Sequence, residues 1–348
     1  MASNVPEQSL VHPYALGATL YMPITHPSAV DVVFGRKLQG LRSVVLCLED
    51  ALADVDVPEG LARLSKLLVD LRASKRDYIA TPLVFVRPRN LEMAASLTGM
   101  PAIDAVDGLV CPKVRPGQVR AWAETVSGTK LRLMPTLETR EILDPLAVRD
   151  LRDELTAEAN SRILALRVGG NDLLACLGLR RSRGRTVYDG PLRDVLANLV
   201  NLMVPAGFRL TAPVNEIIDD DEALKREVAE DVAWGFVGKT AIHPSQMPII
   251  HAAFAVRDQD LDAAQLILAP CAPAVFRHDG AMCEPATHRA WATSIIERSR
   301  YHGLRPPEAS TPDTKGTAPA LSEERDAPIS GRRFVPRLRA IQCTDAFK

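Results

Sequence analysis

Short apolar runs alternate with longer segments of helical periodicity along this chain of 348 residues, starting near residue 18. Eight runs have the length and composition of buried strands. They cover residues 18–22, 43–48, 83–86, 108–111, 131–135, 163–168, 209–212 and 235–237. Strands that alternate with helices are typical of a parallel sheet wrapped by helices, and eight strands are the number that closes a barrel. The pattern therefore predicts an α/β fold, a (β/α)8 TIM barrel.

The segments between these runs carry the apolar stripes of outer helices. The leucines of residues 61–71 recur at helical spacing, and residues 191–204 and 219–234 show the same periodicity. Past the eighth run, residues 244–254, 260–268 and 285–301 predict a C-terminal helical extension. We therefore place the barrel and its C-terminal helices together in residues 1–303.

The remaining residues have a different composition. Residues 304–330 are rich in Pro, Thr, Ser and acidic residues and contain few large apolar side chains, which predicts a flexible, partly disordered linker. Residues 331–348 regain Phe334, Val335, Leu338 and Ile341. These apolar residues suit a tail that docks, at a place the sequence does not indicate.

Composition narrows the class of protein further. Hydrophobic residues make up 47% of the chain and the net charge is −1, so nothing in the sequence calls for a nucleic-acid partner. No segment reaches the roughly 18 uninterrupted apolar residues that a membrane-spanning helix needs, and the first residues do not resemble a signal peptide. The sequence thus predicts a cytoplasmic protein with no membrane partner.

Two carboxylates follow predicted strands directly. Glu138 comes just after the run 131–135, and Asp172 comes after the run 163–168. Because the carboxyl ends of parallel strands meet on one face, both side chains are placed to share a hard divalent cation such as Mg²⁺. Each acid alone is equally explained by capping of the next helix, for which Thr136 and Thr139 are further candidates.

Other charged residues occupy the same predicted face. Glu49 and Asp50 end the second run, Arg87 ends the third, and Lys113 follows the fourth. Four acids close together repel one another unless a cation or basic side chains offset them. Arg87 and Lys113 supply such an offset, although Lys113 is also explained as a simple partner of a neighbouring acid.

A dense basic segment follows Asp172. It contains Arg180, Arg181, Arg183 and Arg185. Arginine forks suit phosphate and carboxylate groups, so a loop folded over the barrel mouth is able to clamp an anion of the substrate. The alternative is a solvated run of charge, and the sequence leaves both interpretations open.

The order of these segments resembles the HpcH/HpaI aldolase and citrate lyase beta-subunit superfamily. The resemblance rests on the six segments Leu48-Glu49-Asp50-Ala51, Val86-Arg87, Pro112-Lys113-Val114, Leu137-Glu138-Thr139, Gly170-Asn171-Asp172-Leu173 and Gly238-Lys239-Thr240-Ala241-Ile242-His243-Pro244-Ser245-Gln246. The resemblance spans roughly residues 20–301. Within the superfamily, the Gly170 segment and the long C-terminal extension resemble those of the tellurite-resistance-associated C–C bond lyase branch. The resemblance also implies a homo-oligomer, a trimer or a hexamer.

The resemblance also implies roles for the acids and Arg87. Glu138 and Asp172 would hold Mg²⁺, and Arg87 would stabilise the enolate oxygen that forms when a carbon–carbon bond next to a carbonyl breaks. Glu49 and Asp50 would orient Arg87 or the waters of the metal. Glu284, where the family has an aspartate, would give or take a proton, in its own or a neighbouring subunit.

Three hypotheses of function follow. The first is a Mg²⁺-dependent lyase or aldolase that acts on a β-hydroxy or β-oxo acid, or on its CoA thioester. The second is hydrolysis of an acyl-CoA thioester at the same site, because both reactions need an oxyanion stabiliser. The third is an inactive barrel that serves as an interaction subunit.

Overall fold

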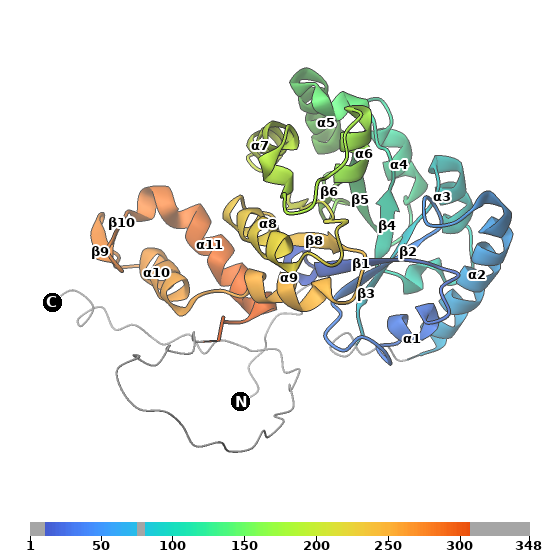
Figure 1. The fold of residues 1–348 in the computed structure, drawn as a ribbon, viewed down its shortest axis with the longest axis horizontal. Coiled ribbons are helices and arrows are strands. Elements are labelled where there is room, and N and C mark those ends of the chain that lie inside the picture. Colours follow the sequence, from blue (N-terminus) through green and yellow to red (C-terminus); the bar gives the residue numbers. More distant parts are fainter. Residues whose placement is uncertain (1–10, 75–80, 307–348) are drawn as a thin grey trace, which may run out of the picture. The chain divides into compact units, whose positions relative to one another are not determined.

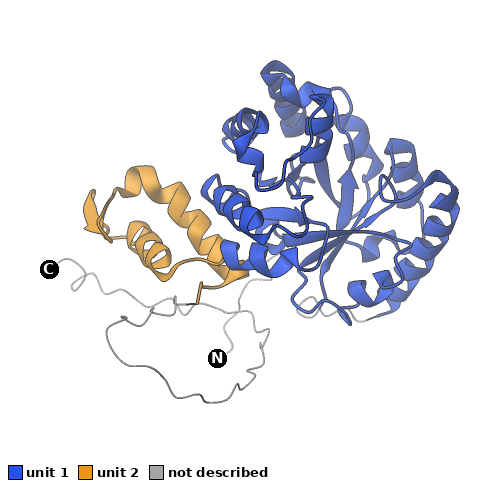
Figure 2. Cartoon of the chain, viewed as in Figure 1, with its two compact units in different colours: residues 1–254 blue, residues 255–348 orange. Residues whose placement is uncertain are grey.

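The computed structural model describes residues 11–74 and 81–306. These residues belong to two compact units, Met1–Phe254 and Ala255–Lys348 (Figure 2). The sequence-based grouping of residues 1–303 combines parts of both units, and it stays a prediction. The linker predicted from residue 304 and the tail 331–348 lie outside the described residues, except for residues 304–306.

A parallel sheet of eight strands forms the centre of the first unit (Figure 1). Its strands run in the order β7-β6-β5-β4-β3-β2-β1-β8, and a parallel bridge between Ala212 and Lys239 joins the two outer strands. The strands are β1 Gly17–Pro23, β2 Ser43–Cys47, β3 Leu83–Arg87, β4 Gly108–Cys111, β5 Arg132–Leu137, β6 Leu166–Val168, β7 Leu210–Thr211 and β8 Gly238–Ala241. The predicted (β/α)8 barrel is confirmed.

Helices surround this sheet and cover its outer side (Figure 1). They are α1 Ala29–Val33, α2 Val57–Ala73, α3 Leu91–Thr98, α4 Val119–Thr125, α5 Pro145–Glu158, α6 Gly170–Cys176, α7 Leu192–Met203, α8 Asp221–Ala233 and α9 Gln246–Phe254. The leucine stripe explains the packing of α2, because Leu64, Leu67, Leu68 and Leu71 are all buried. Side chains alternate between the two sides of each strand, so one set packs on helices and the other fills the barrel.

The eighth strand is not where the apolar pattern placed it. Residues 235–237 lead into the strand, which starts at Gly238 and contains Lys239. The charge of Lys239 hid this strand from a search for apolar runs, since the lysine is fully buried against Glu227 and Asp231 of α8. A charged residue is compatible with a buried strand when the facing helix supplies its counter-ions.

The second unit contains a helical pair and a small hairpin. Helices α10 Asp258–Leu268 and α11 Pro285–His302 bury Leu261, Ile267 and Ile295 in a core of their own. Strands β9 Phe276–His278 and β10 Ala281–Cys283 are antiparallel and are joined by Asp279-Gly280, both with positive φ. Asp-Gly is a favoured two-residue hairpin turn because both positions need φ above zero.

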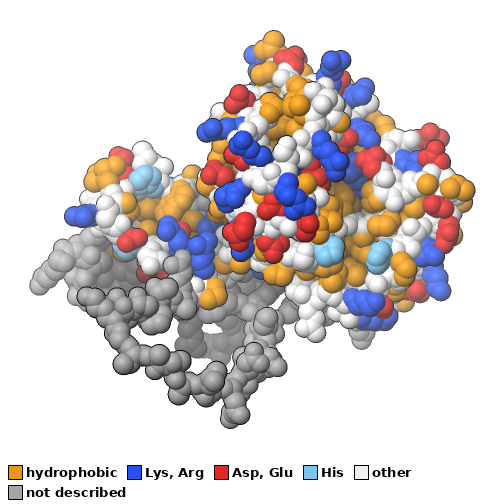
Figure 3. All heavy atoms as spheres, viewed as in Figure 1, with side chains coloured by type: hydrophobic (Ala, Val, Ile, Leu, Met, Phe, Trp, Pro, Cys, Tyr) orange, Lys and Arg blue, Asp and Glu red, His pale blue; other side chains and the backbone are white. Residues whose placement is uncertain are grey.

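Surface charges are mixed in sign. Figure 3 shows acidic and basic side chains interspersed over the barrel on the face seen in Figure 1. Among residues 11–74 and 81–306, no helix has the length and apolar character needed to cross a membrane.

Candidate active site

The carboxyl ends of strands β2 to β5 bring the predicted rim residues together. Arg87 is the last residue of β3, and Glu138 directly follows β5. Glu49 and Asp50 follow β2, and Lys113 follows β4. We call these five residues the rim cluster, and ion pairs or hydrogen bonds link all of them.

Arg87 lies at the centre of the rim cluster. Its Nη2 atom is 2.5 Å from Glu49 Oε2, 3.1 Å from Glu138 Oε1 and 3.5 Å from Asp50 Oδ2. All of these contacts use Nη2, and the buried Nε has no hydrogen-bond partner among the described residues. Burial acts to lower the pKa of Arg87, but the charges of Glu138 and Glu49 outweigh it and raise the pKa. The guanidinium is therefore anchored through Nη2, while Nε and Nη1 keep donors for a ligand.

Lys113 contributes both its backbone and its side chain. Its N–H donates to Glu138 Oε1 at 2.8 Å, and its Nζ lies 2.7 Å from Glu49 Oε1 and 3.3 Å from Asp50 Oδ1. The residue has φ of 50°, a left-handed conformation that is uncommon for a side chain other than glycine. Backbone strain of this kind concentrates at functional sites. The predicted pairing of Lys113 with a neighbouring acid is observed.

Glu138 is a buried carboxylate whose two oxygens differ in their hydrogen-bond partners. Only 3% of the residue is exposed, and Oε1 accepts from both Arg87 and Lys113. None of the described residues donates to Oε2, which faces Gly169. A Cβ at Gly169 would come within 2.4 Å of this oxygen, so only glycine leaves the space beside it.

Asp172 approaches the same carboxylate from α6. Burial raises the pKa of Glu138 to about 7; Arg87 opposes this shift, and the negative charge of Asp172 adds to it. The N-cap of α6 is Gly169, and no side chain makes a capping hydrogen bond there. The capping explanation for Asp172 therefore does not hold, and its position in the first helical turn leaves its carboxylate available.

Glu49 and Asp50 are neighbours whose pKa values shift in opposite directions. Burial raises the pKa of Glu49, against the opposing effects of Arg87 and Lys113. Burial also acts to raise the pKa of Asp50, but the hydrogen bond with Glu49 and the charges of Arg87 and Lys113 outweigh it and lower the pKa. Such a pair is suited to hold one proton between two carboxylates.

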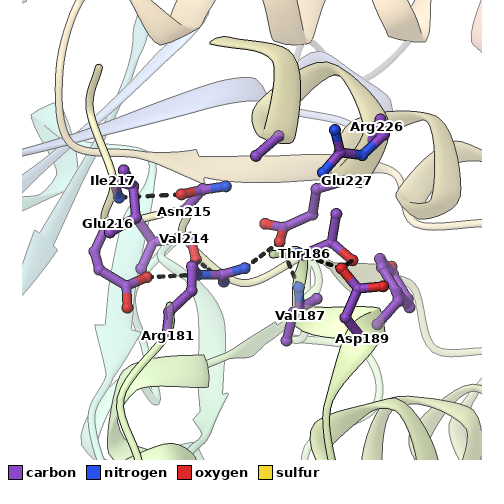
Figure 4. A network of polar contacts seen from close by, with 12 residues as sticks. Arg181, Thr186, Val187, Asp189, Val214, Asn215, Glu216, Ile217, Arg226 and Glu227 are labelled. Carbon is purple, nitrogen blue, oxygen red and sulfur yellow. Dashed lines mark hydrogen bonds and ion pairs between the residues drawn. The ribbon is translucent and has the colours of Figure 1, made fainter. Parts of the chain in front are cut away.

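The arginine segment after α6 is divided between the interior and the surface. Arg181 is buried and makes three contacts, with Glu216 at 2.8 Å, with the Val214 carbonyl at 3.0 Å and with Glu227 (Figure 4). Arg180 and Arg183 are exposed, and Arg183 pairs with Asp219 at 2.7 Å. The contacts of Arg181 favour a structural role over contact with a substrate.

Arg181 belongs to a second charged group, which we call the wall cluster. Besides Arg181 it contains Glu227, Asp231, Lys239 and Tyr188. Lys239 Nζ lies 2.9 Å from Glu227 Oε1 and 2.8 Å from Asp231 Oδ2. Glu227 Oε2 accepts from Arg181 and from the Val187 N–H. Asp231 Oδ1 accepts from the Tyr188 hydroxyl. Burial raises the pKa of Asp231 to about 6 against the opposing charge of Lys239.

Sequence reasoning missed two residues inside the barrel below the rim cluster. Tyr21 of β1 lies between Arg87 and Arg167, whose Cζ atoms are 6.0 Å and 5.1 Å from its ring centroid. Arg167 of β6 is 1% exposed. The available signal was an arginine within an otherwise apolar strand, on the side of the strand that the barrel encloses.

Glu284 belongs to the second unit. It is the N-cap residue of α11, where its N–H donates to His288 Nδ1 at 3.1 Å and its Oε2 accepts from the Thr287 hydroxyl at 3.0 Å. Its role in proton transfer stays a prediction.

Comparison with known proteins agrees with this architecture. Residues 10–304 match the family described as C-C bond lyase of the TIM-barrel fold, and the chain belongs to this family. The predictions of the superfamily and of a carbon–carbon lyase are thereby confirmed. The link to tellurite resistance stays a prediction.

Curated relatives include two kinds of CoA-thioester enzyme. A (3S)-malyl-CoA thioesterase of Cereibacter sphaeroides is 27% identical over 257 residues, which cover 73% of this chain and 81% of the relative. The mitochondrial citramalyl-CoA lyase of Mus musculus is 26% identical over 273 residues, covering 72% and 75%.

Solved structures share the fold. A citrate lyase from Burkholderia xenovorans superposes with a TM-score of 0.64 at 19% identity, covering 84% of this chain and 94% of that one. CitE from Mycobacterium tuberculosis, in complex with magnesium, acetoacetate and coenzyme A, gives a TM-score of 0.59 at 21% identity, covering 82% and 99%.

Proposed function

We propose that the rim of this barrel is a Mg²⁺-dependent site that cleaves or forms a carbon–carbon bond in a β-hydroxy acid or its CoA thioester. The observation that carries the proposal is the pair Glu138 and Asp172 beside Arg87. Glu138 is buried, its Oε2 has no protein donor among the described residues, and a second carboxylate lies close to it. A divalent cation would relieve this repulsion, and Arg87 is already in place for an anionic substrate.

The donor set fits magnesium. In the part of the chain that the structure describes, no group of three or more His, Cys, Asp or Glu side chains is arranged to hold a metal. Mg²⁺ is commonly held by one or two carboxylates and completes its shell with water and substrate oxygens. Glu138 and Asp172 would hold the ion, and Gly169 lets the Glu138 carboxylate lie against the start of α6, where Asp172 is located. When bound, the cation would supply positive charge next to the carbonyl and carboxylate oxygens of the substrate.

Arg87 would bind the substrate oxygen that becomes negative. The Nε and Nη1 groups remain as donors after Nη2 has bound the carboxylates, and they point to different sides of the guanidinium. Each would donate separately to an enolate or carboxylate oxygen, and both are fixed before the reaction starts. Glu49 and Asp50 would orient this fork and hold a proton close to it. Glu284 would give or take the proton at carbon.

Anion recognition outside the reacting centre is proposed for Lys113, Arg180 and Arg183. The Lys113 side chain is about half exposed at the rim, and both arginines are exposed. A phosphate of a CoA substrate or a second carboxylate is the anion that they would bind. Arg181 would contribute by holding the segment in place through Glu216 and Glu227.

Hydrolysis of the thioester is the second candidate, and the similarity to a (3S)-malyl-CoA thioesterase favours it. The two reactions differ in their products. A lyase releases an oxo acid together with a shorter acyl-CoA, whereas a thioesterase releases free CoA thiol. Incubation with malyl-CoA or citramalyl-CoA and separate assays for oxo acid and thiol distinguish them.

Titration calorimetry tests the site without knowledge of the natural substrate. Metal-free protein is titrated with Mg²⁺ in the presence and absence of oxaloacetate, pyruvate or glyoxylate, and wild type is compared with Asp172→Asn. Asp194→Asn is the matched control, since Asp194 is an exposed acid in the first turn of another barrel helix, α7. Metal-dependent binding that only Asp172→Asn removes supports the proposal. Absence of binding by wild type would favour the interaction-subunit hypothesis.

We also propose a homo-oligomer, a trimer or a hexamer, on the resemblance of the sequence to its superfamily. Light scattering coupled to size-exclusion chromatography measures the number of subunits directly, and a monomer would overturn this part. The cytoplasmic location stays a prediction.

A further inference from the structure

Three side chains, which we call the column, lie in contact inside the barrel. The Tyr21 ring is shared by two guanidinium groups, with the Cζ of Arg87 6.0 Å and that of Arg167 5.1 Å from its centroid. They come from three separate strands, β1, β3 and β6. Guanidinium groups within about 6 Å of an aromatic ring are attracted by its π electrons. The column therefore connects the rim to the barrel interior.

Arg167 is held firmly at the lower end of this column. Nη1 donates to Thr19 at 3.3 Å and Nη2 donates to Thr240 at 2.6 Å. Burial lowers the pKa of Arg167, and Tyr21 partly opposes this shift. Within the described residues no carboxylate forms an ion pair with it. A buried cation without a counter-ion is costly, so a packing role alone does not account for this arginine.

Arg87 needs support on the side that faces the interior. Its protein anchors all act on Nη2, so a guanidinium fixed at this one atom is free to pivot around it. The ring of Tyr21 is the group that lies against its face. A pivot of the fork would move Nε and Nη1 away from the position of the substrate oxygen, and catalytic donors lose effect when misplaced by about 1 Å.

We propose that Tyr21 is a positioning residue that holds the guanidinium of Arg87 in its substrate-binding orientation, with Arg167 as the second guanidinium against the same ring. This inference rests on the proposed function for the purpose of Arg87, but the orientation itself can be measured without substrate. The ring performs the positioning, and the hydroxyl is not required for it.

Two variants separate the ring from the hydroxyl. Tyr21→Leu removes the ring and keeps an apolar side chain, whereas Tyr21→Phe keeps the ring and removes the hydroxyl. Tyr188→Phe is the matched control, because it also removes a hydroxyl that is bonded to a charged side chain, Asp231 in the wall cluster. Crystal structures of the three variants, free of ligand, report the position of the Arg87 guanidinium. Calorimetry with Mg²⁺ and oxaloacetate reports affinity.

We expect Tyr21→Leu to displace or disorder the Arg87 guanidinium and to weaken oxaloacetate binding about tenfold. Tyr21→Phe should restore both the orientation and an affinity within about threefold of wild type. Tyr188→Phe should change neither. An Arg87 fork that stays in place in Tyr21→Leu, or an equal loss of affinity in Tyr188→Phe, would overturn the inference. Displacement of Arg87 together with no oxaloacetate binding by wild type would support the positioning role and refute the proposed function.

Discussion

The rim cluster and the wall cluster are built from the same kinds of residue and differ in how completely their charges are satisfied. In the wall cluster both oxygens of Glu227 and both of Asp231 accept hydrogen bonds, and Lys239 has two carboxylate partners. In the rim cluster the buried Nε of Arg87 has no partner, and Glu138 accepts through one oxygen only, within residues 11–74 and 81–306. A closed network stabilises a structure, while an open network of buried charge is prepared for a ligand.

Their positions on the barrel wall explain the difference. Lys239 is directed outward between β8 and α8, where no ligand has access and every charge must be paired within the protein. Arg87 and Glu138 end their strands on the inward side, at the carboxyl-terminal face where barrels of this kind carry their active sites. Substitutions in the two clusters should consequently affect different measurements.

Lys239→Met should produce the largest change in stability. It leaves Glu227 and Asp231 buried without their shared counter-ion, and loss of one partner of a buried pair costs about 3–5 kcal/mol. Urea unfolding measures this loss, and the affinity of the folded fraction for oxaloacetate should be unchanged. Lys225→Met, at an exposed lysine of α8, is the control and should leave the unfolding midpoint close to that of wild type. A stable Lys239→Met variant would contradict the structural role of the wall cluster.

Glu138→Gln should have the opposite profile. Removal of this carboxylate should lower kcat/KM about a thousandfold, because a metal contributes several kcal/mol of charge stabilisation. The free energy of unfolding should stay the same or increase, since a buried acid that repels Asp172 is replaced by a neutral side chain. Steady-state kinetics in the presence of Mg²⁺ tests the effect on kcat/KM, and urea unfolding tests the effect on stability. Unchanged turnover would remove Glu138 from the proposed metal site.

Arg87→Lys should lower kcat/KM about a hundredfold while the protein stays folded, because one lysine ammonium cannot both bind the carboxylates and reproduce the fixed, separate donors of the guanidinium. The positive charge is kept, so Glu49 and Glu138 still have a partner. Kinetics and thermal unfolding on the same samples separate activity from stability. Turnover close to that of wild type would refute the role of Arg87 at the enolate oxygen.

The pH dependence of stability should reveal Glu138 in metal-free protein. Burial raises its pKa from 4.5 to about 7, so the folded state binds the proton more tightly than the unfolded state does. This contribution to stability is fully present below pH 4.5 and is lost as the pH rises through 7. With a chelator present, the unfolding temperature should therefore fall between about pH 5 and pH 8. Saturating Mg²⁺, or Glu138→Gln, should make the slope smaller, and Asp231 in the wall cluster should account for part of what remains. An unchanged slope in Glu138→Gln would show that Glu138 does not contribute.

The smallest effect is expected at the exposed arginines. Arg180→Gln combined with Arg183→Gln should raise the KM for a CoA thioester about twofold to fivefold, because exposed ion pairs contribute little. The KM for the corresponding free acid should not change. Equal KM values for wild type and variant with the thioester would favour a solvated segment without contact to substrate.

Much of this architecture follows from local sequence. An apolar run that ends in an acid places Glu138 and Asp172 on the same face, because parallel strands share a direction. The predicted boundaries of β8 were wrong because the buried charge of Lys239 is neutralised by two acids of α8. Residues next to Lys239 in the sequence give no sign of this pairing. For the same reason the sequence shows an arginine at 181 but not that Glu227 lies against it.

Two further features needed the structure for different reasons. The hairpin of β9 and β10 was missed although Asp279-Gly280 is a strong turn signal, since its strands are short and alternate weakly. Tyr21 and Arg167 were missed because their importance depends on three strands facing one another across the barrel.

The position of Tyr21 makes the protein a candidate for substrate discovery by ultraviolet spectroscopy. A phenol between two guanidinium groups absorbs according to the local electric field, and an acid that binds to Arg87 would alter that field. The chain has only 5 tyrosines, so the background of a difference spectrum is small, and Tyr21→Phe provides the blank. Libraries of organic acids and thioesters could thus be sorted by an intrinsic chromophore before any product of the reaction has been identified.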